Sequence, residues 1–367
     1  MTTLFSPIRI GGLDLPNRIA VSPMCMYAGN EGVASAWHWA HIGGLAMSGA
    51  GVVIMEATGV EPIGRISAKC LGIWNDAQEE ALARLIAGIR EFSDTAIGIQ
   101  LGHAGRKASS GIGGMGGVAI ADGGWRGCAP SAIGFGNGYE VPDAMTQEDI
   151  GRVVAAFAEA ALRADRAGFS LIELHGAHGY LISEFLSPLA NKRTDAYGGS
   201  HEKRMRFPLE VIRAVRAVWP RGKAFGMRMN GSDWHPEGMT TAQAAIAARA
   251  FAEAGLDYVT VSGGATAPDV TIPPIVPGYM VGMAEQVKRE SGIATMTVGM
   301  ITSGMQAEEI IASGRADLVA VARGFLDDPR WAWHAAAELG VEPAIPPRLR
   351  HVLPGRWPAY PSLHKLP

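Results

Sequence analysis

The stretch Arg166-Ala-Gly-Phe-Ser-Leu-Ile-Glu-Leu-His175 joins an expected helix to an expected strand. The segment Gln147–Ala167 is amphipathic, and Gly168 is the usual residue for the left-handed turn that ends a helix. The apolar run Ser170–His175 then has the length and composition of a buried strand. Glu253-Ala-Gly255 ends another amphipathic segment in the same way. The pattern therefore predicts a helix that returns to a parallel strand.

This helix-to-strand unit recurs along the chain. Short apolar runs predict eight strands, at Ile19–Ser22, Gly51–Glu56, Ala96–Leu101, Ser170–His175, Ala224–Met229, Asp257–Ser262, Ala294–Val298 and Asp317–Val321. Amphipathic segments between them predict helices, among them Ala77–Glu91, Gln147–Ala167, Lys203–Val218, Thr241–Ala254 and Gln306–Ser313. Strands alternating with helices in this number predict one (β/α)8 TIM barrel. An open doubly wound sheet would need a GxGxxG turn after the first strand, where the chain has Ser22-Pro-Met-Cys-Met-Tyr27.

Three segments lie outside the repeat, although we expect residues 1–367 to form a single domain. Ile8–Leu15, interrupted by Gly11-Gly12, predicts a small hairpin that covers the bottom of the barrel. Ala104–Asp143 is rich in Gly and Pro and is far longer than an ordinary connection, which is typical of a functional loop. Residues 341–367 form a C-terminal extension that is a candidate oligomer contact.

Composition excludes several classes of protein. The net charge is −3 without a long run of one sign, which argues against nucleic-acid or membrane partners. Cys25, Cys70 and Cys128 form no CxxC pair, so we expect neither a disulfide framework nor a structural zinc, and a reducing cytoplasm suits them. The N-terminus lacks the basic and apolar regions of a signal peptide, and the longest apolar stretch, Ile42–Met55, is too short to cross a bilayer. We expect a soluble cytoplasmic protein.

Candidate catalytic residues follow the fourth expected strand, since barrel enzymes carry their sites on the loops after the strands. His175 and His178 are three residues apart and can point into one pocket with Tyr180. As neutral imidazoles they can donate two hydrogen bonds to one substrate oxygen, and the tyrosine can supply a proton. Two other interpretations remain open at this point. One is a pair of buried structural histidines, and the other is a metal pair that lacks an obvious third ligand.

Other strand ends add further candidates. The first offers Pro23, Met24, Cys25 and Tyr27, and the third offers Gln100, whose amide suits the edge of a flavin ring. Arg228 lies inside an apolar fifth strand, where a buried cation needs a reduced flavin or a structural carboxylate as its partner. Val298-Gly-Met-Ile-Thr-Ser-Gly304 and Val321-Ala-Arg-Gly324 resemble the phosphate site of many barrels. Together these residues indicate a phosphorylated cofactor.

The segment Asn191-Lys-Arg-Thr-Asp-Ala-Tyr-Gly-Gly-Ser200, with Arg204 and Arg206, closely resembles the signature of the Old Yellow Enzyme family. The resemblance runs from about Leu4 to Gly340 and includes Ser22-Pro-Met-Cys25, His103-Ala-Gly-Arg-Lys107, Ala129-Pro-Ser131 and Asp317-Leu-Val. Cys25, Tyr27 and the His175-x-x-His178 pair resemble its thermophilic-like branch, which includes bacterial xenobiotic reductases.

The resemblance implies that FMN lies across the barrel mouth. By this resemblance, the residues contacting the ring system would be Ser22, Pro23, Met24, Cys25, Ala57, Gln100 and Arg228. Those holding the phosphate would be Gly299, Ala322 and Arg323. Cys25 would tune the flavin potential, His175 and His178 would bind the activating oxygen of the substrate, Tyr180 would be the proton donor and Tyr27 a substrate contact.

The implied reaction is that of an FMN-dependent ene-reductase. NADPH or NADH reduces FMN, and flavin N5 then gives hydride to the β-carbon of an activated alkene while Tyr180 protonates the α-carbon. The substrate would be a small activated alkene or nitro compound, and the enzyme a homodimer or homotetramer. Two alternatives are a non-catalytic flavin redox sensor and a metal-dependent lyase or hydrolase using His175 and His178.

The sequence departs from the family pattern at two places. Ala322 replaces the usual glycine before the phosphate arginine, and because its backbone amide is retained we expect FMN binding to survive. The tail around Arg356 and Trp357 does not align with the family. In this branch a C-terminal Arg or Trp often reaches the active site of a neighbouring subunit, and Arg356 and Trp357 are the candidates here. Because they do not align, the sequence does not determine the shape of the substrate that the site accepts.

Overall fold

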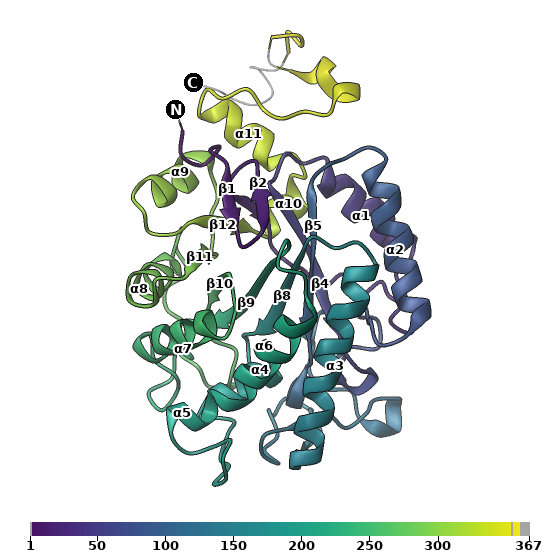
Figure 1. Cartoon of the computed structure of the whole chain (residues 1–367), viewed down its shortest axis with the longest axis vertical. Helices are drawn as coiled ribbons and strands as arrows, with labels where there is room; N and C mark the ends of the chain where they lie inside the picture. Colours follow the sequence, from purple (N-terminus) through teal and green to yellow (C-terminus); the bar gives the residue numbers. More distant parts are fainter. Residues whose placement is uncertain (1, 354, 360–367) are drawn as a thin grey trace.

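The computed structural model describes residues 2–353 and 355–359, and its centre is a closed barrel of eight parallel strands (Figure 1). This confirms the predicted TIM barrel. Around the barrel the strands are β3 (Ile19–Val21), β4 (Val52–Gly59), β5 (Ala96–Gly102), β8 (Leu171–Gly176), β9 (Ala224–Asn230), β10 (Tyr258–Ser262), β11 (Ala294–Thr297) and β12 (Leu318–Val321). Each overlaps its predicted range, and β4 extends furthest beyond it.

Helices cover the outside of the barrel, and side-chain caps fix the start of several of them. Thr146 caps α3, Thr240 caps α7 and Asn75 caps α2, each within a reciprocal capping box. The helices are α1 (Ala36–Ala46), α2 (Asp76–Arg90), α3 (Gln147–Arg166), α4 (Leu181–Leu186), α5 (His201–Arg204), α6 (Arg206–Val218), α7 (Thr241–Glu253), α8 (Val281–Ser291), α9 (Gly304–Ala312), α10 (Arg323–Asp327) and α11 (Trp331–Glu338). The predicted helix Lys203–Val218 is two helices, α5 and α6, joined at Met205.

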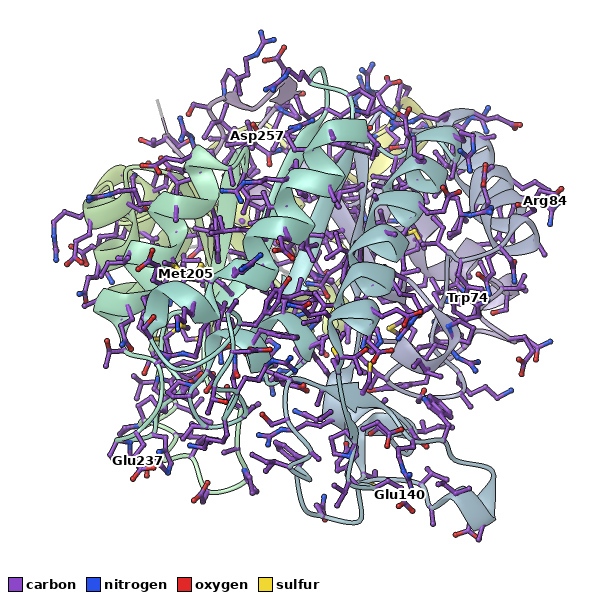
Figure 2. The ribbon with its side chains drawn as sticks, turned by 60° about the horizontal axis from the view of Figure 1, so that its bottom comes forward. Trp74, Arg84, Glu140, Met205, Glu237 and Asp257 are labelled. Atoms are coloured by element: carbon purple, nitrogen blue, oxygen red, sulfur yellow. The ribbon has the colours of Figure 1, made fainter. Side chains whose placement is uncertain are left out.

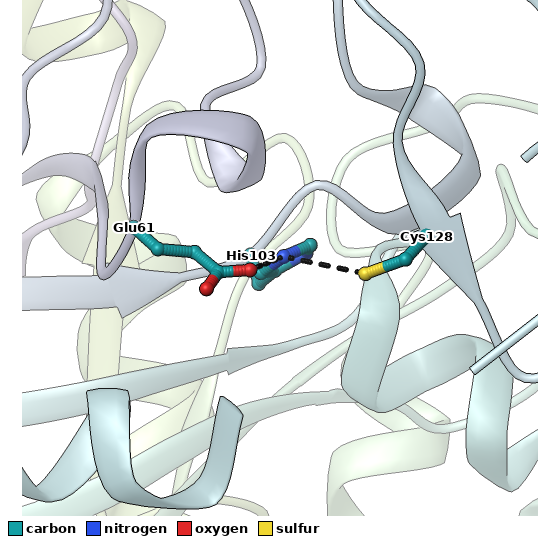
Figure 3. A group of neighbouring side chains, drawn as sticks. All are labelled: Glu61, His103 and Cys128. Carbon is teal, nitrogen blue, oxygen red and sulfur yellow. Dashed lines mark hydrogen bonds and ion pairs between the residues drawn. The ribbon is translucent and has the colours of Figure 1, made fainter. Parts of the chain in front are cut away.

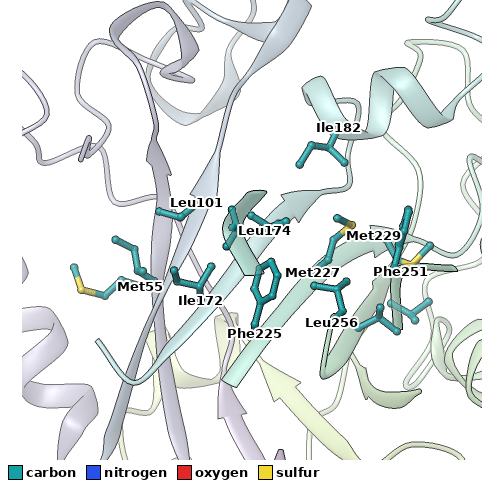
Figure 4. Packing of buried hydrophobic residues seen from close by; sticks show 14 of the residues in the cluster. Met55, Leu101, Ile172, Leu174, Ile182, Phe225, Met227, Met229, Phe251 and Leu256 are labelled. Atoms are coloured by element: carbon teal, nitrogen blue, oxygen red, sulfur yellow. The ribbon is translucent and has the colours of Figure 1, made fainter. Parts of the chain in front are cut away.

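Strand alternation divides the buried side chains into two cores. On β8 and β9 the outward positions, such as Ile172, Leu174, Phe225 and Met227, pack in the layer between the barrel and its helices (Figure 4). The alternate positions face the barrel interior. There the strand starts form a separate apolar cluster that includes Leu171. Charged residues at the later inward positions therefore point toward the mouth.

The N-terminal hairpin closes the bottom of the barrel, as predicted. It consists of β1 (Ile8–Ile10) and β2 (Leu13–Leu15). Ile10 and Leu15 pack into the interior cluster formed by the strand starts. Gly11 has φ +56°, and a side chain there would collide with Asp257 at the beginning of β10. Figure 2 shows Asp257 at one end of the molecule and the loops that carry Glu140 and Glu237 at the other.

The predicted long excursion after β5 lies over the mouth and contains short 3-10 turns rather than helices. Its two-residue strand β6 (Cys128–Ala129) pairs with β7 (Asp143–Ala144). The signature loop is tied to it, because Arg193 donates to the carbonyls of Pro130 and Met145. Arg193 also pairs with Asp195 at 2.6 Å. These signature residues thus hold the mouth loops in place.

The beginning of the C-terminal extension lies at the bottom of the barrel. Residues 344–347 and 350 line a surface cavity there together with parts of β2 and the loop after α2. Arg356 and Trp357 belong to the segment that leaves the barrel beside α11 and the N-terminus (Figure 1). Their predicted reach into a neighbouring subunit stays a prediction, and residues 354 and 360–367 lie outside the described part. In the described segments no helix combines the length and apolarity needed to cross a bilayer.

Candidate active site

The strand register brings the predicted ring-contact residues into adjacent layers. Ala57 on β4 is level with Gln100 on β5, and Gln100 is level with Glu173 on β8. One layer nearer the mouth, His175 on β8 is level with Arg228 on β9. Parallel register therefore converts four separate sequence segments into one polar patch at the carboxyl ends of the strands.

Arg228 is a largely buried cation, and no carboxylate among the described residues forms an ion pair with it. Its two terminal nitrogens make long hydrogen bonds, 3.5 Å to Ser22 Oγ and 3.4 Å to Ser262 Oγ. Its Nε is buried and has no hydrogen-bond partner in the described part of the chain. Burial lowers the pKa of Arg228, and the charge of Glu173 partly opposes this shift. An anionic group at the mouth would satisfy the donors that the protein leaves open.

His175, His178 and Tyr180 form a cluster of edge-to-face rings. The ring centroids of His175 lie 5.4 Å from His178 and 4.7 Å from Tyr180. Burial, followed by the charge of Arg228, lowers the pKa of both histidines well below 6.5, so both are neutral at pH 7. Burial raises the pKa of Tyr180 well above 10, so Tyr180 keeps its proton.

Hydrogen bonds fix which nitrogen of each imidazole carries the proton. His175 Nδ1 accepts from the amide of Ala177, which leaves Nε2 as the donor. Ser262 Oγ accepts from Arg228 and lies 2.7 Å from His178 Nε2. The Ser262 hydroxyl has two acceptors in reach, Met280 Sδ at 3.8 Å and the much closer His178 Nε2. Donation to the closer Nε2 places the His178 proton on Nδ1. Both rings then have an N–H to offer a ligand.

Cys25 and Tyr27 lie in a small cluster that includes Tyr180. They pack with Ala57, Cys70 and Tyr180. A hydrogen bond to Cys70, followed by burial, raises the pKa of the Cys25 thiol well above its usual range. Burial raises the pKa of Tyr27 to about 12. Both groups are therefore protonated at neutral pH.

The predicted phosphate residues line the far end of the mouth. A cleft of about 820 Å³ contains Gly299, Ala322 and Arg323 and continues to Ser22, His178 and Arg228. Arg323 is exposed at the start of α10. Ala322 has φ −105°, outside the left-handed region that would require glycine.

Met24, a predicted ring contact, is half-buried, and its side chain packs against the outer core. Pro23 follows Ser22 and is buried.

Several backbone positions at the mouth are strained, and two of them are predicted site residues. Tyr27 has φ 54° and His178 has φ 59°, in the left-handed region that non-glycine residues seldom adopt. Strained backbone of this kind is typical of functional sites, where the surrounding structure holds a side chain in one position. The main chain of His178 is held by Asn230 Oδ1, which accepts its amide proton at 3.1 Å.

Lys107 is a site residue whose role the sequence did not reveal. Its Nζ donates to the carbonyls of His178 and Ala265, at 2.9 and 3.2 Å. It also lies 5.0 Å from the ring centroid of Tyr180. Burial lowers the pKa of Lys107 to about 8. The available signal was its place directly after the third strand, but its contacts come from loops distant in sequence.

A separate cluster beside the mouth has potential metal ligands, formed by Glu61, His103 and Cys128 (Figure 3). His103 Nε2 is 2.8 Å from Glu61 and 3.8 Å from Cys128 Sγ. His103 Nδ1 accepts from the amide of Gly105, whereas a histidine bound to a metal normally donates from its other nitrogen. Arg152 already pairs with Glu61. We interpret the cluster as a structural hydrogen-bond network. His175 and His178 belong to no three-ligand group in the described residues.

Comparison with known proteins decides the family. The sequence profile of the NADH:flavin oxidoreductase / NADH oxidase family matches residues 3–342. The chain belongs to this family. This family includes the Old Yellow Enzymes, as predicted, and the solved Old Yellow Enzyme homologue of Zymomonas mobilis is 25% identical with a TM-score of 0.74, covering 89% of this chain and 90% of that one.

Curated relatives extend over nearly the whole chain. The NADPH dehydrogenase of Geobacillus thermodenitrificans is 47% identical over 347 residues, which are 94% of this chain and 97% of that protein. A structure of morphinone reductase in complex with tetrahydroNAD is 28% identical with a TM-score of 0.77, covering 94% of this chain and 93% of that one. The protein is therefore an NAD(P)H-dependent, FMN-binding flavin oxidoreductase. The open donors of Arg228 and the cleft that ends at Arg323 fit this cofactor.

The assignment of Arg323 to the phosphate predicts a difference between two flavins. We expect Arg323→Gln to weaken FMN binding by about ten- to a hundredfold, the usual effect of losing a charge-assisted hydrogen bond. Riboflavin has the same ring but no phosphate, so its affinity should change less than twofold. Fluorescence titration of the flavin-free protein measures both. Equal losses for FMN and riboflavin would contradict the assignment.

Proposed function

We propose that the protein is an ene-reductase that reduces activated alkenes, such as enones, and related nitro compounds. The observation that carries this proposal is the combination of two neutral histidines and one protonated tyrosine whose rings lie against one another at the barrel mouth. When bound, FMN supplies the hydride chemistry, taking hydride from NAD(P)H and giving it to the β-carbon of the alkene.

The roles of the protein side chains follow from their protonation. His175 Nε2 and His178 Nδ1 would donate hydrogen bonds to the carbonyl or nitro oxygen of the substrate. These bonds strengthen as negative charge develops on that oxygen, and each is worth about 3 kcal/mol in a preorganised site. Tyr180 would then protonate the α-carbon, and Tyr27 would contact the substrate. Cys25, a protonated thiol in the same cluster, would adjust the flavin potential.

The cation of Lys107 supports the proton-donor role of Tyr180. Once Tyr180 has given up its proton, the phenolate needs a nearby positive charge. Lys107 supplies that charge beside the ring, and its two backbone carbonyl contacts hold it there. The same contacts connect it to the loop that carries His178.

Assembly and cell location are further parts of the proposal. We propose a homodimer or homotetramer in which Arg356 or Trp357 completes a neighbouring site, and a cytoplasmic location. The C-terminal extension supports the first part, because it follows the bottom of its own barrel instead of approaching its own mouth.

The proton-donor role predicts unequal effects on the two half-reactions. In Tyr180→Phe we expect anaerobic reduction of the flavin by NADPH to change less than threefold. Reoxidation by 2-cyclohexenone should slow by about a hundredfold or more, because the α-carbon loses its acid. Stopped-flow absorbance of the flavin measures both rates. Equal slowing of the two half-reactions would remove Tyr180 from this role, and wild-type protein whose reduced flavin ignores enones would overturn the alkene substrate.

Lys107 predicts a pH dependence. Its charge is present below about pH 8 and is lost as pH rises through 8, so the rate of reoxidation by enone should fall across this range. In Lys107→Met the rate at pH 7 should be about fivefold lower, and the bend near pH 8 should disappear. Lys203→Met, which removes an exposed lysine on α5, should retain the bend. An unchanged profile in Lys107→Met would show that the bend comes from another group.

A further inference from the structure

Glu173 is a fully buried carboxylate within the barrel, one layer below Arg228. Gln100 Nε2 donates to its Oε1 at 2.8 Å. Thr260 Oγ1 donates to its Oε2 at 2.5 Å, and the hydroxyl of Tyr258 lies 3.4 Å from the same oxygen. Tyr258 can reach it because Gly226, level with both residues in the register, leaves space for the tyrosine ring.

This arrangement is that of an ionised carboxylate. Amide and hydroxyl donors converge on both oxygens, and such bonds favour the charged form. Burial raises the pKa of Glu173, while Thr260, Arg228 and Gln100 each oppose the rise. Glu173 and Arg228 attract one another, yet Arg228 directs its terminal nitrogens to Ser22 and Ser262. The negative charge therefore acts on the mouth without neutralising the guanidinium through an ion pair.

Glu173 also fixes the orientation of Gln100. Because the Nε2 end of the amide donates to the carboxylate, the Oε1 end remains available as an acceptor. Below this layer the barrel interior holds an apolar cluster that includes Leu171 and Ala224. The Glu173 carboxylate thus lies beneath the Arg228 cation and orients the Gln100 amide at the mouth.

We propose that Glu173 is a positioning residue that sets the reduction potential of the bound FMN. This inference rests on the proposed placement of FMN beside Arg228 and Gln100. Oxidised flavin is neutral in its ring, whereas the reduced ring carries negative charge near N1 and O2. Arg228 favours the reduced form, and the charge of Glu173 offsets part of that effect. The native carboxylate therefore holds the potential lower than Arg228 alone would, which makes reduced flavin a stronger hydride donor.

The test is a redox titration of the FMN-bound enzyme with Glu173→Gln. Glutamine keeps the shape and loses the charge, so we expect the two-electron equilibrium to shift about tenfold toward reduced flavin, an upward change of about 30 mV. Glu184→Gln is the matched control. Glu184 is also fully buried, and because burial raises its pKa to about 7 both titrations are run at pH 8, where most of its charge is present. Its neighbours are Arg106, His103 and Lys107 rather than Arg228, so the flavin potential in this variant should move less than a third as far. Equal shifts in both variants, or no shift in Glu173→Gln, would overturn the proposal.

A milder variant keeps the test decisive if Glu173→Gln does not fold. Tyr258→Phe retains the ring over Gly226 and removes one of the donors that favour the charged form of Glu173. The carboxylate then carries less negative charge, so the potential should rise slightly, by about threefold or less in the equilibrium. A fall would overturn the proposal. Neither titration uses an alkene. A shifted potential without alkene turnover would overturn the proposed substrate alone, whereas an unshifted potential with normal turnover would overturn this inference alone.

Discussion

The unpaired charge of Arg228 is the constraint on which the candidate site depends. A guanidinium buried among apolar strands costs free energy unless an anion accepts its hydrogen bonds. The terminal nitrogens of Arg228 donate only to two serine hydroxyls, at 3.4 and 3.5 Å. Its Nε has no hydrogen-bond partner in the described residues. A flavin ring becomes anionic on reduction and can then accept these hydrogen bonds. Its attraction to Arg228 is therefore strongest in the reduced form, which is the form that donates hydride.

The same charge determines the chemistry of its neighbours. After burial, Arg228 is the next cause that lowers the pKa of His175 and His178. It therefore helps to keep both imidazoles neutral, in the form that donates a hydrogen bond without already carrying charge. Lys107 acts in the same direction and lies beside Tyr180. In the proposed mechanism, one electrostatic arrangement would thus serve the cofactor, the substrate oxygen and the proton donor, and Glu173 would limit the effect of Arg228.

Much of this could be predicted from sequence because the relevant signals are local. Glycine stops such as Gly168 and the apolar strands identified the barrel. The strand ends pointed to His175, Arg228 and the proposed phosphate residues, which the structure places at the barrel mouth. What could not be predicted depends on register. Gln100 and Glu173 are level only because β5 and β8 pair in one particular alignment. The most diagnostic sequence motif proved structural: Arg193 ties loops together and lies outside the cleft.

The central claim is that Arg228 is matched to the reduced flavin, and differential affinity tests it most directly. We would measure binding of oxidised and of chemically reduced FMN to flavin-free wild type and to Arg228→Met, which fills the same space without charge. The account predicts that the substitution weakens binding of reduced FMN at least tenfold more than binding of oxidised FMN. Equal weakening of both forms, or a greater loss for the oxidised form, would contradict it and leave Arg228 as a packing residue.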